Sequence, residues 1–357
     1  MTTEKKNIFR RQGSASHFLF SKTDTGRLKE LKKTEIIDAN EAVRSAFPDM
    51  RSGSDFIDYA NQQIDALDQF SAMVVRLDQA EEDKDRAGLP EGEDGHGDVA
   101  AILDRLGRKE NGWWGTLDDG LFGSFLPGKN GSDSLELARD IQKRLVEKTG
   151  KTVTIGVASF PTITYKKSEI ISNARKALDH ATFFGANSLV AFDDVSLNIS
   201  GDKFYEKGEL QEAINEFKLA LELDPNNVNV HNSLGVCYGL QSHYDSAIEA
   251  FHKAIAIDPG EYMALYNLGL VHLLIEQQDQ TLEYFLDAYK INGYNFEVAF
   301  QTGKIYLETG NIEKSRPYLE RAAEMGPDSG PVYRYLGDCY AADHMPQAAI
   351  SAYKKAI

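Results

Sequence analysis

The chain has 357 residues, of which 42% are hydrophobic and 26% charged, so it is long enough for two or three domains that each bury a core. Its 39 basic and 55 acidic residues give a net charge of −16, which disfavours binding to the phosphate backbone of nucleic acids. No apolar run approaches the roughly 18 residues that a membrane-spanning helix needs, and no signal peptide is recognisable, so the sequence predicts a cytoplasmic protein.

Residues 1–33 form a basic segment without a sustained apolar period, which predicts a flexible tail. Its basic residues are Lys5, Lys6, Arg10, Arg11, Lys22, Arg27, Lys29, Lys32 and Lys33. Besides a solvated tail, two roles stay open. One is an electrostatic tether to an acidic partner or an anionic lipid surface, and the other is contact with the acidic body of the same protein.

Residues 34–69 predict a helical lead-in of two helices. The apolar residues of the first recur at helical spacing and stop at Pro48, and Ser54 and Asp55 are typical of the start of the second. We expect these helices to pack on the domain that follows or to link it to a neighbouring chain.

Between residues 70 and 193, strand patterns alternate with helical patterns. Phe70–Leu77 is a nearly continuous apolar run, typical of a central strand that is buried on both faces. Residues 113–127 contain two short strand patterns around Asp118-Asp119-Gly120, which predicts a hairpin. The remaining predicted elements are helices over 99–108, 132–147 and 168–184 and strands over 152–158 and 188–192.

This order resembles the GGDEF family of bacterial diguanylate cyclases. The similarity is clearest in TVTIGVA (152–158) and ARKALDHATFFGANSLVAFD (174–193). FSAMVVRLD (70–78) is similar to the family's first strand, and GHGD (95–98) to a shortened form of its Gly-His…Gly-Asp segment. The resemblance implies an α/β (α+β) nucleotide-cyclase-like fold with a central mixed sheet over residues 70–193.

The residues that would carry cyclase chemistry are changed. The family signature falls on Asp118, Asp119, Gly120, Leu121 and Phe122, of which only the Phe matches. The resemblance places the two carboxylate ligands of the catalytic Mg²⁺ pair at Arg76 and Leu121, which offer no oxygen to a metal. Phosphoryl transfer depends on such ions, so the sequence predicts an inactive domain without metal or cofactor.

Other positions of the cyclase family are changed or ambiguous. The stretch 109–112 has neither end of the Arg-x-x-Asp motif of the inhibitory product site. Asp98 matches a family position that contacts guanine, and the alternative is an N-cap of the helix that follows. For Arg76, the alternatives are an anion contact and an ion pair with Asp119.

Two other functions stay open for this domain. The first is an active diguanylate cyclase that uses Mg²⁺ and GTP with a shifted metal site formed by Asp78, Asp118 or Asp119. The second is a sensor that binds GTP or cyclic di-GMP without turnover.

From residue 194 the sequence repeats with a period of 34 residues. Small, aromatic and glycine residues recur at fixed positions: Ala213, Ala247 and Thr281; Phe217, Phe251 and Phe285; Gly201, Gly235, Gly269, Gly303 and Gly337. This pattern is similar to that of tetratricopeptide (TPR) repeats, which are paired helices. It predicts an all-α superhelix of five repeats over 194–357, the last incomplete, that follows the cyclase-like domain without a flexible linker. Because no capping helix follows Ile357, we expect the natural chain to continue.

The first helix of each TPR repeat lines the concave face in the family. The resemblance therefore assigns partner binding to Asn232, Tyr266, Leu270, Leu273, Phe300 and Lys304. The alternative is that some of these residues pack within their own repeat. We expect an exposed, mostly apolar row that binds a peptide or helix of a protein partner. The whole sequence predicts a bacterial scaffold protein of cyclic di-GMP signalling.

The two cysteines, Cys237 and Cys339, lie far apart and have no Cys or His at the spacing of metal ligands. We expect both to be buried free thiols in a reducing compartment.

Overall fold

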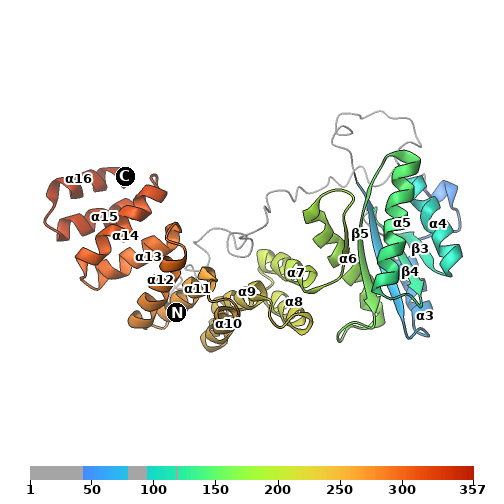
Figure 1. The fold of residues 1–357 in the computed structure, drawn as a ribbon, viewed down its shortest axis with the longest axis horizontal. Coiled ribbons are helices and arrows are strands. Elements are labelled where there is room, and N and C mark those ends of the chain that lie inside the picture. The colour runs from blue at the N-terminus through green and yellow to red at the C-terminus, as the bar shows by residue number, and fades with distance from the viewer. Residues whose placement is uncertain (1–42, 79–94, 118–119) are drawn as a thin grey trace. The chain divides into compact units, whose positions relative to one another are not determined.

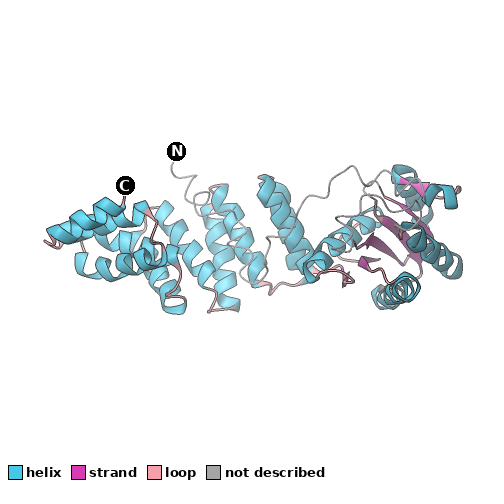
Figure 2. Ribbon diagram, turned by 90° about the horizontal axis from the view of Figure 1, so that it is seen from above, coloured by secondary structure: helices cyan, strands magenta, loops and turns pink. Residues whose placement is uncertain are grey.

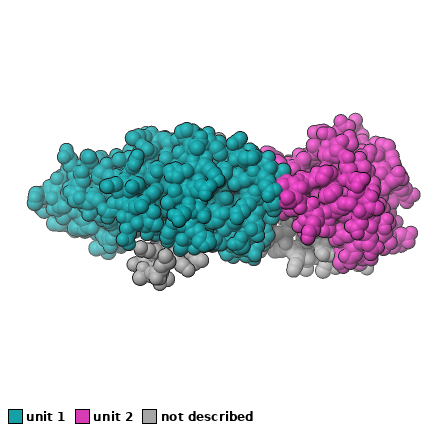
Figure 3. All heavy atoms as spheres, turned by 90° about the horizontal axis from the view of Figure 1, so that it is seen from below, with its two compact units in different colours: residues 1–21, 201–357 teal, residues 22–200 magenta. Residues whose placement is uncertain are grey.

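The structure is a computed structural model that describes residues 43–78, 95–117 and 120–357. The described residues fall into two compact units, one ending at residue 200 and the other beginning at residue 201 (Figure 3). The predicted tail over 1–33, most of the first lead-in helix, Asp118 and Asp119 lie outside the described residues.

A mixed sheet of six strands forms the centre of the N-terminal unit, in the order β1-β3-β4-β2-β5-β6 (Figure 1). The strands are β1 (Arg51–Ser52), β2 (Phe70–Leu77), β3 (Trp113–Thr116), β4 (Phe122–Pro127), β5 (Val153–Phe160) and β6 (Leu189–Ala191). Strand β2 is antiparallel to both β4 and β5, whereas β1 pairs with β3 and β5 with β6 in parallel. The predicted mixed sheet, central strand and hairpin are confirmed, and β1 was missed because two residues carry no period.

Helices cover both faces of this sheet. They are α3 (Gly53–Ile64), α4 (His96–Glu110), α5 (Gly131–Thr149) and α6 (Ile170–Ala181), the last flanked by the short 3₁₀ turns η3 (Lys167–Glu169) and η4 (Thr182–Phe184). Figure 1 shows α6 on one side of the sheet and α4 and α5 on the other. Met73 and Val75 of β2 belong to the core beneath α4 and α5, whereas Ala72 and Val74 belong to the core beneath α3 and α6. Both faces of β2 are therefore buried, which explains its unbroken apolar run.

The C-terminal unit is built of helices alone, as Figure 2 shows. Helix α7 (Asp194–Lys207) crosses the division between the two units. The further helices are α8 (Leu210–Leu223), α9 (Val228–Leu240), α10 (Tyr244–Ile257), α11 (Tyr262–Leu274), α12 (Gln278–Ile291), α13 (Phe296–Glu308), α14 (Ile312–Met325), α15 (Gly330–Ala342) and α16 (Pro346–Lys355). They alternate between a first and a second helix of a repeat, as the 34-residue period predicts.

The period has a direct packing reason. A Cβ atom on Gly235 of α9 would lie 2.6 Å from the ring of Phe251 on α10, so only glycine lets the two helices of this repeat approach so closely. Gly269 meets Phe285 in the same way. In the last two repeats Leu319 and Tyr353 replace the phenylalanine opposite Gly303 and Gly337. Glycine and a large side chain are thus paired once in each repeat.

Within the described ranges, no helix combines the length and the apolar character needed to cross a lipid bilayer.

Candidate functional site

The first helices of the array, α9, α11, α13 and α15, carry two columns of side chains at the repeat spacing. One column, here called the upper column, consists of Asn232, Tyr266, Phe300 and Arg334. The other, called the lower column, begins on α7 and consists of Asp202, Val236, Leu270, Lys304 and Asp338. Five of the six residues predicted to bind a partner belong to these columns, and Leu273 does not.

The predicted exposed row is wrong for the middle repeats. Tyr266 is 1% exposed and stacks on Phe285 with 5.4 Å between ring centroids, and Leu270 is 0% exposed. The reason is that α11 is buried nearly all round, from Met263 to His272, and not along one stripe. Leu273 is partly buried against the same core. These apolar side chains are therefore covered and not exposed to solvent.

Asn232 is also buried, and its role is structural in this arrangement. Its side-chain oxygen accepts a hydrogen bond of 3.0 Å from Nδ2 of Asn267 on the next first helix. Because a buried amide is costly without partners, this bond fixes α9 against α11.

The two columns together are here called the inner face of the array. Its C-terminal part is more accessible and carries an aromatic–cationic cluster. We define this cluster as Phe300, Lys304, Arg334 and Tyr335. The rings of Phe300 and Tyr335 meet edge to face at a centroid distance of 5.5 Å. Lys304 Nζ lies 5.5 Å and the Arg334 guanidinium carbon 4.9 Å from the centre of the Tyr335 ring. Phe300, Lys304 and Tyr335 are half-buried, and Arg334 is exposed.

The chemistry of this cluster suits an extended ligand that carries carboxylates. Each cation is held over an aromatic face, which positions it and leaves its N–H donors available. Arg334 can bind a carboxylate through two parallel hydrogen bonds, and the rings offer an apolar surface beside it. The Lys304 ammonium also lies 3.8 Å from Glu308, a weak pair on the same helix.

Two of the cluster residues, Arg334 and Tyr335, were missed by the sequence analysis. The signal for Arg334 was available, because it follows Phe300 by one full period of 34 residues. Tyr335 had no such signal, since its place in the cluster follows from a ring contact and not from register.

In the N-terminal unit, the Asp78 carboxylate has a structural role. Its oxygens accept hydrogen bonds from the hydroxyls of Thr152 (2.8 Å) and Thr154 (2.6 Å) and from the backbone N–H of Asn187 (2.7 Å). Arg76, for which a pair with Asp119 was one alternative, lies 3.9 Å from Asp78. One carboxylate therefore ties the end of β2 to β5 and to the loop before β6.

The signature positions that the structure describes are used for packing. Leu121 and Phe122 are buried, in the cores on opposite faces of the sheet. The hairpin closes with a hydrogen bond of 2.7 Å from the N–H of Leu117 to the carbonyl of Leu121, and Gly120 has a φ of +74°. A left-handed backbone conformation favours glycine, so the turn itself explains why residue 120 is a glycine.

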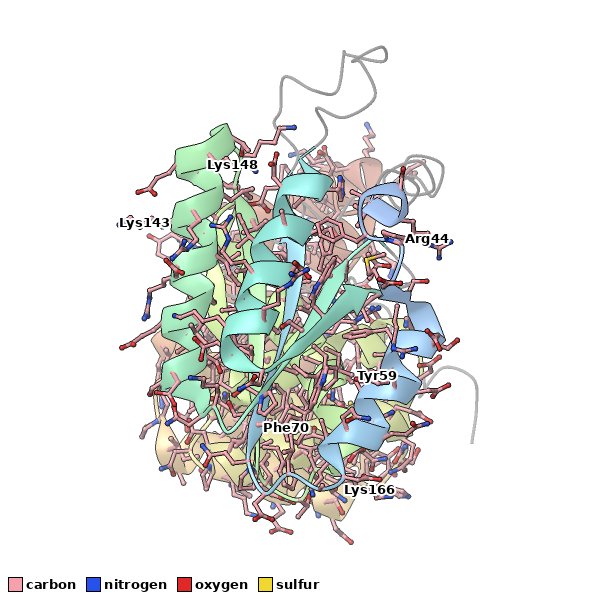
Figure 4. The ribbon with its side chains drawn as sticks, turned by 90° about the vertical axis from the view of Figure 1, so that its right-hand side faces the viewer. Arg44, Tyr59, Phe70, Lys143, Lys148 and Lys166 are labelled. Carbon is pink, nitrogen blue, oxygen red and sulfur yellow. The ribbon has the colours of Figure 1, made fainter. Side chains whose placement is uncertain are left out.

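Asp98 does not cap its helix, so that alternative is wrong. The residue before α4 is Gly95, and Asp98 lies within the first turn, where a negative charge is favourable. Its carboxylate pairs with Lys148 at 2.6 Å, near the C-terminal end of α5 (Figure 4). The predicted guanine contact of Asp98 remains a prediction.

His180, Asp193 and Ser196 form a polar cluster that resembles a nucleophile–base–acid set only in composition. Asp193 Oδ1 and Ser196 Oγ lie 3.2 and 3.3 Å from the same nitrogen, Nδ1 of His180. A relay needs the acid and the nucleophile on different ring nitrogens. Asp193 also accepts from the N–H of Ser196 at 2.8 Å, so the group caps α7.

Cys237 and Cys339 are free and buried, as predicted. Burial raises the pKa of both thiols, which keeps them protonated and unreactive. Among the described residues, no three His, Cys, Asp or Glu side chains gather in a way that could hold a metal ion.

Comparison with known proteins identifies repeats in the C-terminal unit. Family models described as TPR repeat or tetratricopeptide repeat match residues 201–242, 228–261 and 300–357. The N-terminal unit has no match to a GGDEF family model. A search of curated proteins gave no match.

Among solved structures, the chain is similar to those of MamA and YrrB. A crystal structure of MamA is 27% identical, with 44% of this chain and 91% of that chain covered and a TM-score of 0.41. A crystal structure of YrrB, described as a TPR protein with an unusual peptide-binding site, is 24% identical, with 46% and 85% covered and a TM-score of 0.40.

Proposed function

We propose that this protein is an adaptor whose tetratricopeptide repeats bind an acidic peptide segment of a protein partner at the aromatic–cationic cluster. The observation that carries the proposal is the arrangement of Lys304 and Arg334 over the ring of Tyr335, beside Phe300, on an inner face that is accessible there. Stacked aromatic and arginine side chains are the residue types that dominate binding energies at interfaces.

Charge supports an acidic ligand at this end of the array. Residues 301–357 carry seven acidic and seven basic residues, whereas residues 201–300 carry 16 acidic and five basic ones. The charge of the first repeats therefore repels an acidic peptide, whereas the last repeats carry no excess of negative charge. This difference favours binding of the peptide at the last repeats.

The N-terminal unit is, in this proposal, a cyclase-like domain that has lost catalysis, in a scaffold protein of bacterial cyclic di-GMP signalling. The family resemblance suggests the fold, and Arg76 and Leu121 stand where the resemblance places metal ligands. Asp78, the described carboxylate of the shifted-site hypothesis, already accepts three hydrogen bonds. These observations support a non-catalytic domain.

Selection from a random peptide library displayed on phage tests the binding site with the full chain. The wild-type protein should enrich peptides in which Asp or Glu stands beside apolar residues. A synthetic peptide of the enriched sequence should bind Phe300→Ala about 30-fold more weakly, the loss expected for an aromatic anchor worth about 2 kcal/mol.

Lys218→Ala is the matched control, because Lys218 lies 5.9 Å over the Tyr238 ring but stands on α8, a second helix. Its dissociation constant should stay within about twofold of wild type, and Arg334→Glu should reverse the selected charge. Equal binding of the peptide by wild type, Phe300→Ala and Arg334→Glu would reject the site.

The protein should not convert GTP to cyclic di-GMP with Mg²⁺ or Mn²⁺, because two metal-ligand positions lack carboxylates. Product formation is measured by chromatography against a sample without protein. Product that disappears in Asp78→Ala would favour a cyclase with a shifted metal site.

A further inference from the structure

The inner face of the array is covered at one end and accessible at the other. In the lower column Val236 and Leu270 are buried, whereas Lys304 is half-buried and Asp338 is exposed. The upper column shows the same gradient, from buried Asn232 and Tyr266 to exposed Arg334.

The neighbouring helices do not account for this gradient. Helix α11 contacts the second helix before it, its own second helix and an adjacent first helix, namely α10, α12 and α9. Helix α13 has the equivalent set of neighbours, α12, α14 and α15, yet its Lys304 remains partly accessible. The described neighbours are thus equivalent for the buried and the accessible part of this face.

Asp202 indicates which chemistry a ligand of the first repeats would need. It opens the lower column on α7 and is 2% exposed, and neither carboxylate oxygen has a hydrogen-bond partner among the described residues. Burial, and to a smaller degree the charge of Glu206, raise the pKa of this carboxyl well above its usual value. Without a partner this carboxyl is thus held in its neutral form, and a cation beside it is the group that would stabilise the charged form.

The chain itself contains a segment of the right charge. Residues 1–33 carry nine basic and three acidic residues, opposite in sign to the 16 acidic and five basic residues of 201–300. Lys5-Lys6 and Arg10-Arg11 flank the apolar pair Ile8-Phe9, so cations and apolar side chains stand close together in sequence. The lower column offers the complementary order, with Asp202 followed by Val236 and Leu270.

We propose that the basic N-terminal segment, residues 1–33, binds the inner face of the first three repeats, with one of its Lys or Arg side chains paired to Asp202. This contact separates two binding regions on one face. The acidic first repeats hold a segment of the same chain, and the aromatic–cationic cluster stays available to another protein.

The test uses the protein lacking residues 1–33, which retains every described element, and a fluorescent synthetic peptide of residues 1–33. Fluorescence anisotropy should show binding that weakens with added salt, since charge pairing contributes to it. Asp202→Asn should weaken binding at least about tenfold, the loss of roughly 1.4 kcal/mol that is moderate for a buried charged hydrogen bond.

Asp338→Asn is the matched control. Asp338 occupies the same column in the last repeat, but it is exposed and accepts a hydrogen bond of 2.7 Å from Tyr353. Its substitution should leave the affinity unchanged. A peptide with Gln in place of Lys5, Lys6, Arg10 and Arg11 should not bind the shortened protein. This measurement changes only the peptide, so it tests the proposal even where Asp202→Asn impairs folding of the protein.

The full chain provides the last comparison. Its own segment should compete with the labelled peptide, so the full chain should bind the peptide more weakly than the shortened protein does. The proposal fails if the shortened protein does not bind the peptide, if Asp202→Asn and Asp338→Asn bind alike, or if the full chain binds as tightly as the shortened one.

Discussion

Replacing Tyr266 by Ala should lower the free energy of unfolding of the array by about 3–5 kcal/mol, as removal of a large buried aromatic side chain does. Tyr266 is 1% exposed and stacked on Phe285, so truncation leaves a cavity between α11 and α12. Urea unfolding followed by circular dichroism measures the change.

Tyr294→Ala is the control for this prediction. Tyr294 is 80% exposed, with the Arg321 guanidinium carbon 4.4 Å from its ring centre, so its loss should cost less than about 1 kcal/mol. Similar unfolding of the Tyr266→Ala and wild-type proteins would mean that Tyr266 lies on an exposed face after all.

Ala247→Leu should destabilise the array by about 3 kcal/mol, at the upper end of the range for overpacked cores. Ala247 is 0% exposed and lies on α10, the helix that packs on α9. The two helices are already close there, because Gly235 lies against the Phe251 ring. Three added carbon atoms have no space there, so the helices must separate. A lower midpoint in thermal melting would show this.

The same substitution at Ala256 is the matched control, because Ala256 is exposed on the same helix. Ala256→Leu should melt within a few degrees of wild type. If both variants melt alike, the repeat register that places Ala247 at the crossing is incorrect.

The sequence was informative wherever a period reports packing. The 34-residue step gave the paired helices, since each glycine needs a large side chain opposite it, and the unbroken apolar run of Phe70–Leu77 gave the central strand. The step also gave the two columns of the inner face. It could not show that Tyr266 and Leu270 are covered, because every repeat has the same pattern and burial depends on what lies against it.

Polar contacts were predicted less well, because they join segments that are distant in sequence. Asp98 pairs with Lys148, on another helix, and not with the N-terminus of its own helix. Asp78 binds Thr152, Thr154 and Asn187, none of which is near it in the chain. The hydroxyls and amides involved carry no pattern, so only the folded arrangement identifies them.

The burial of Leu121 restricts which side chains the tip of the hairpin can accept. It lies in the core beneath α3 and α6, among apolar neighbours, at the position where the family resemblance places a metal ligand. A Glu there would put a carboxylate into a hydrocarbon environment. Position 121 therefore tolerates an apolar side chain far better than a charged one, and the tip of the hairpin is tied to the core that it closes.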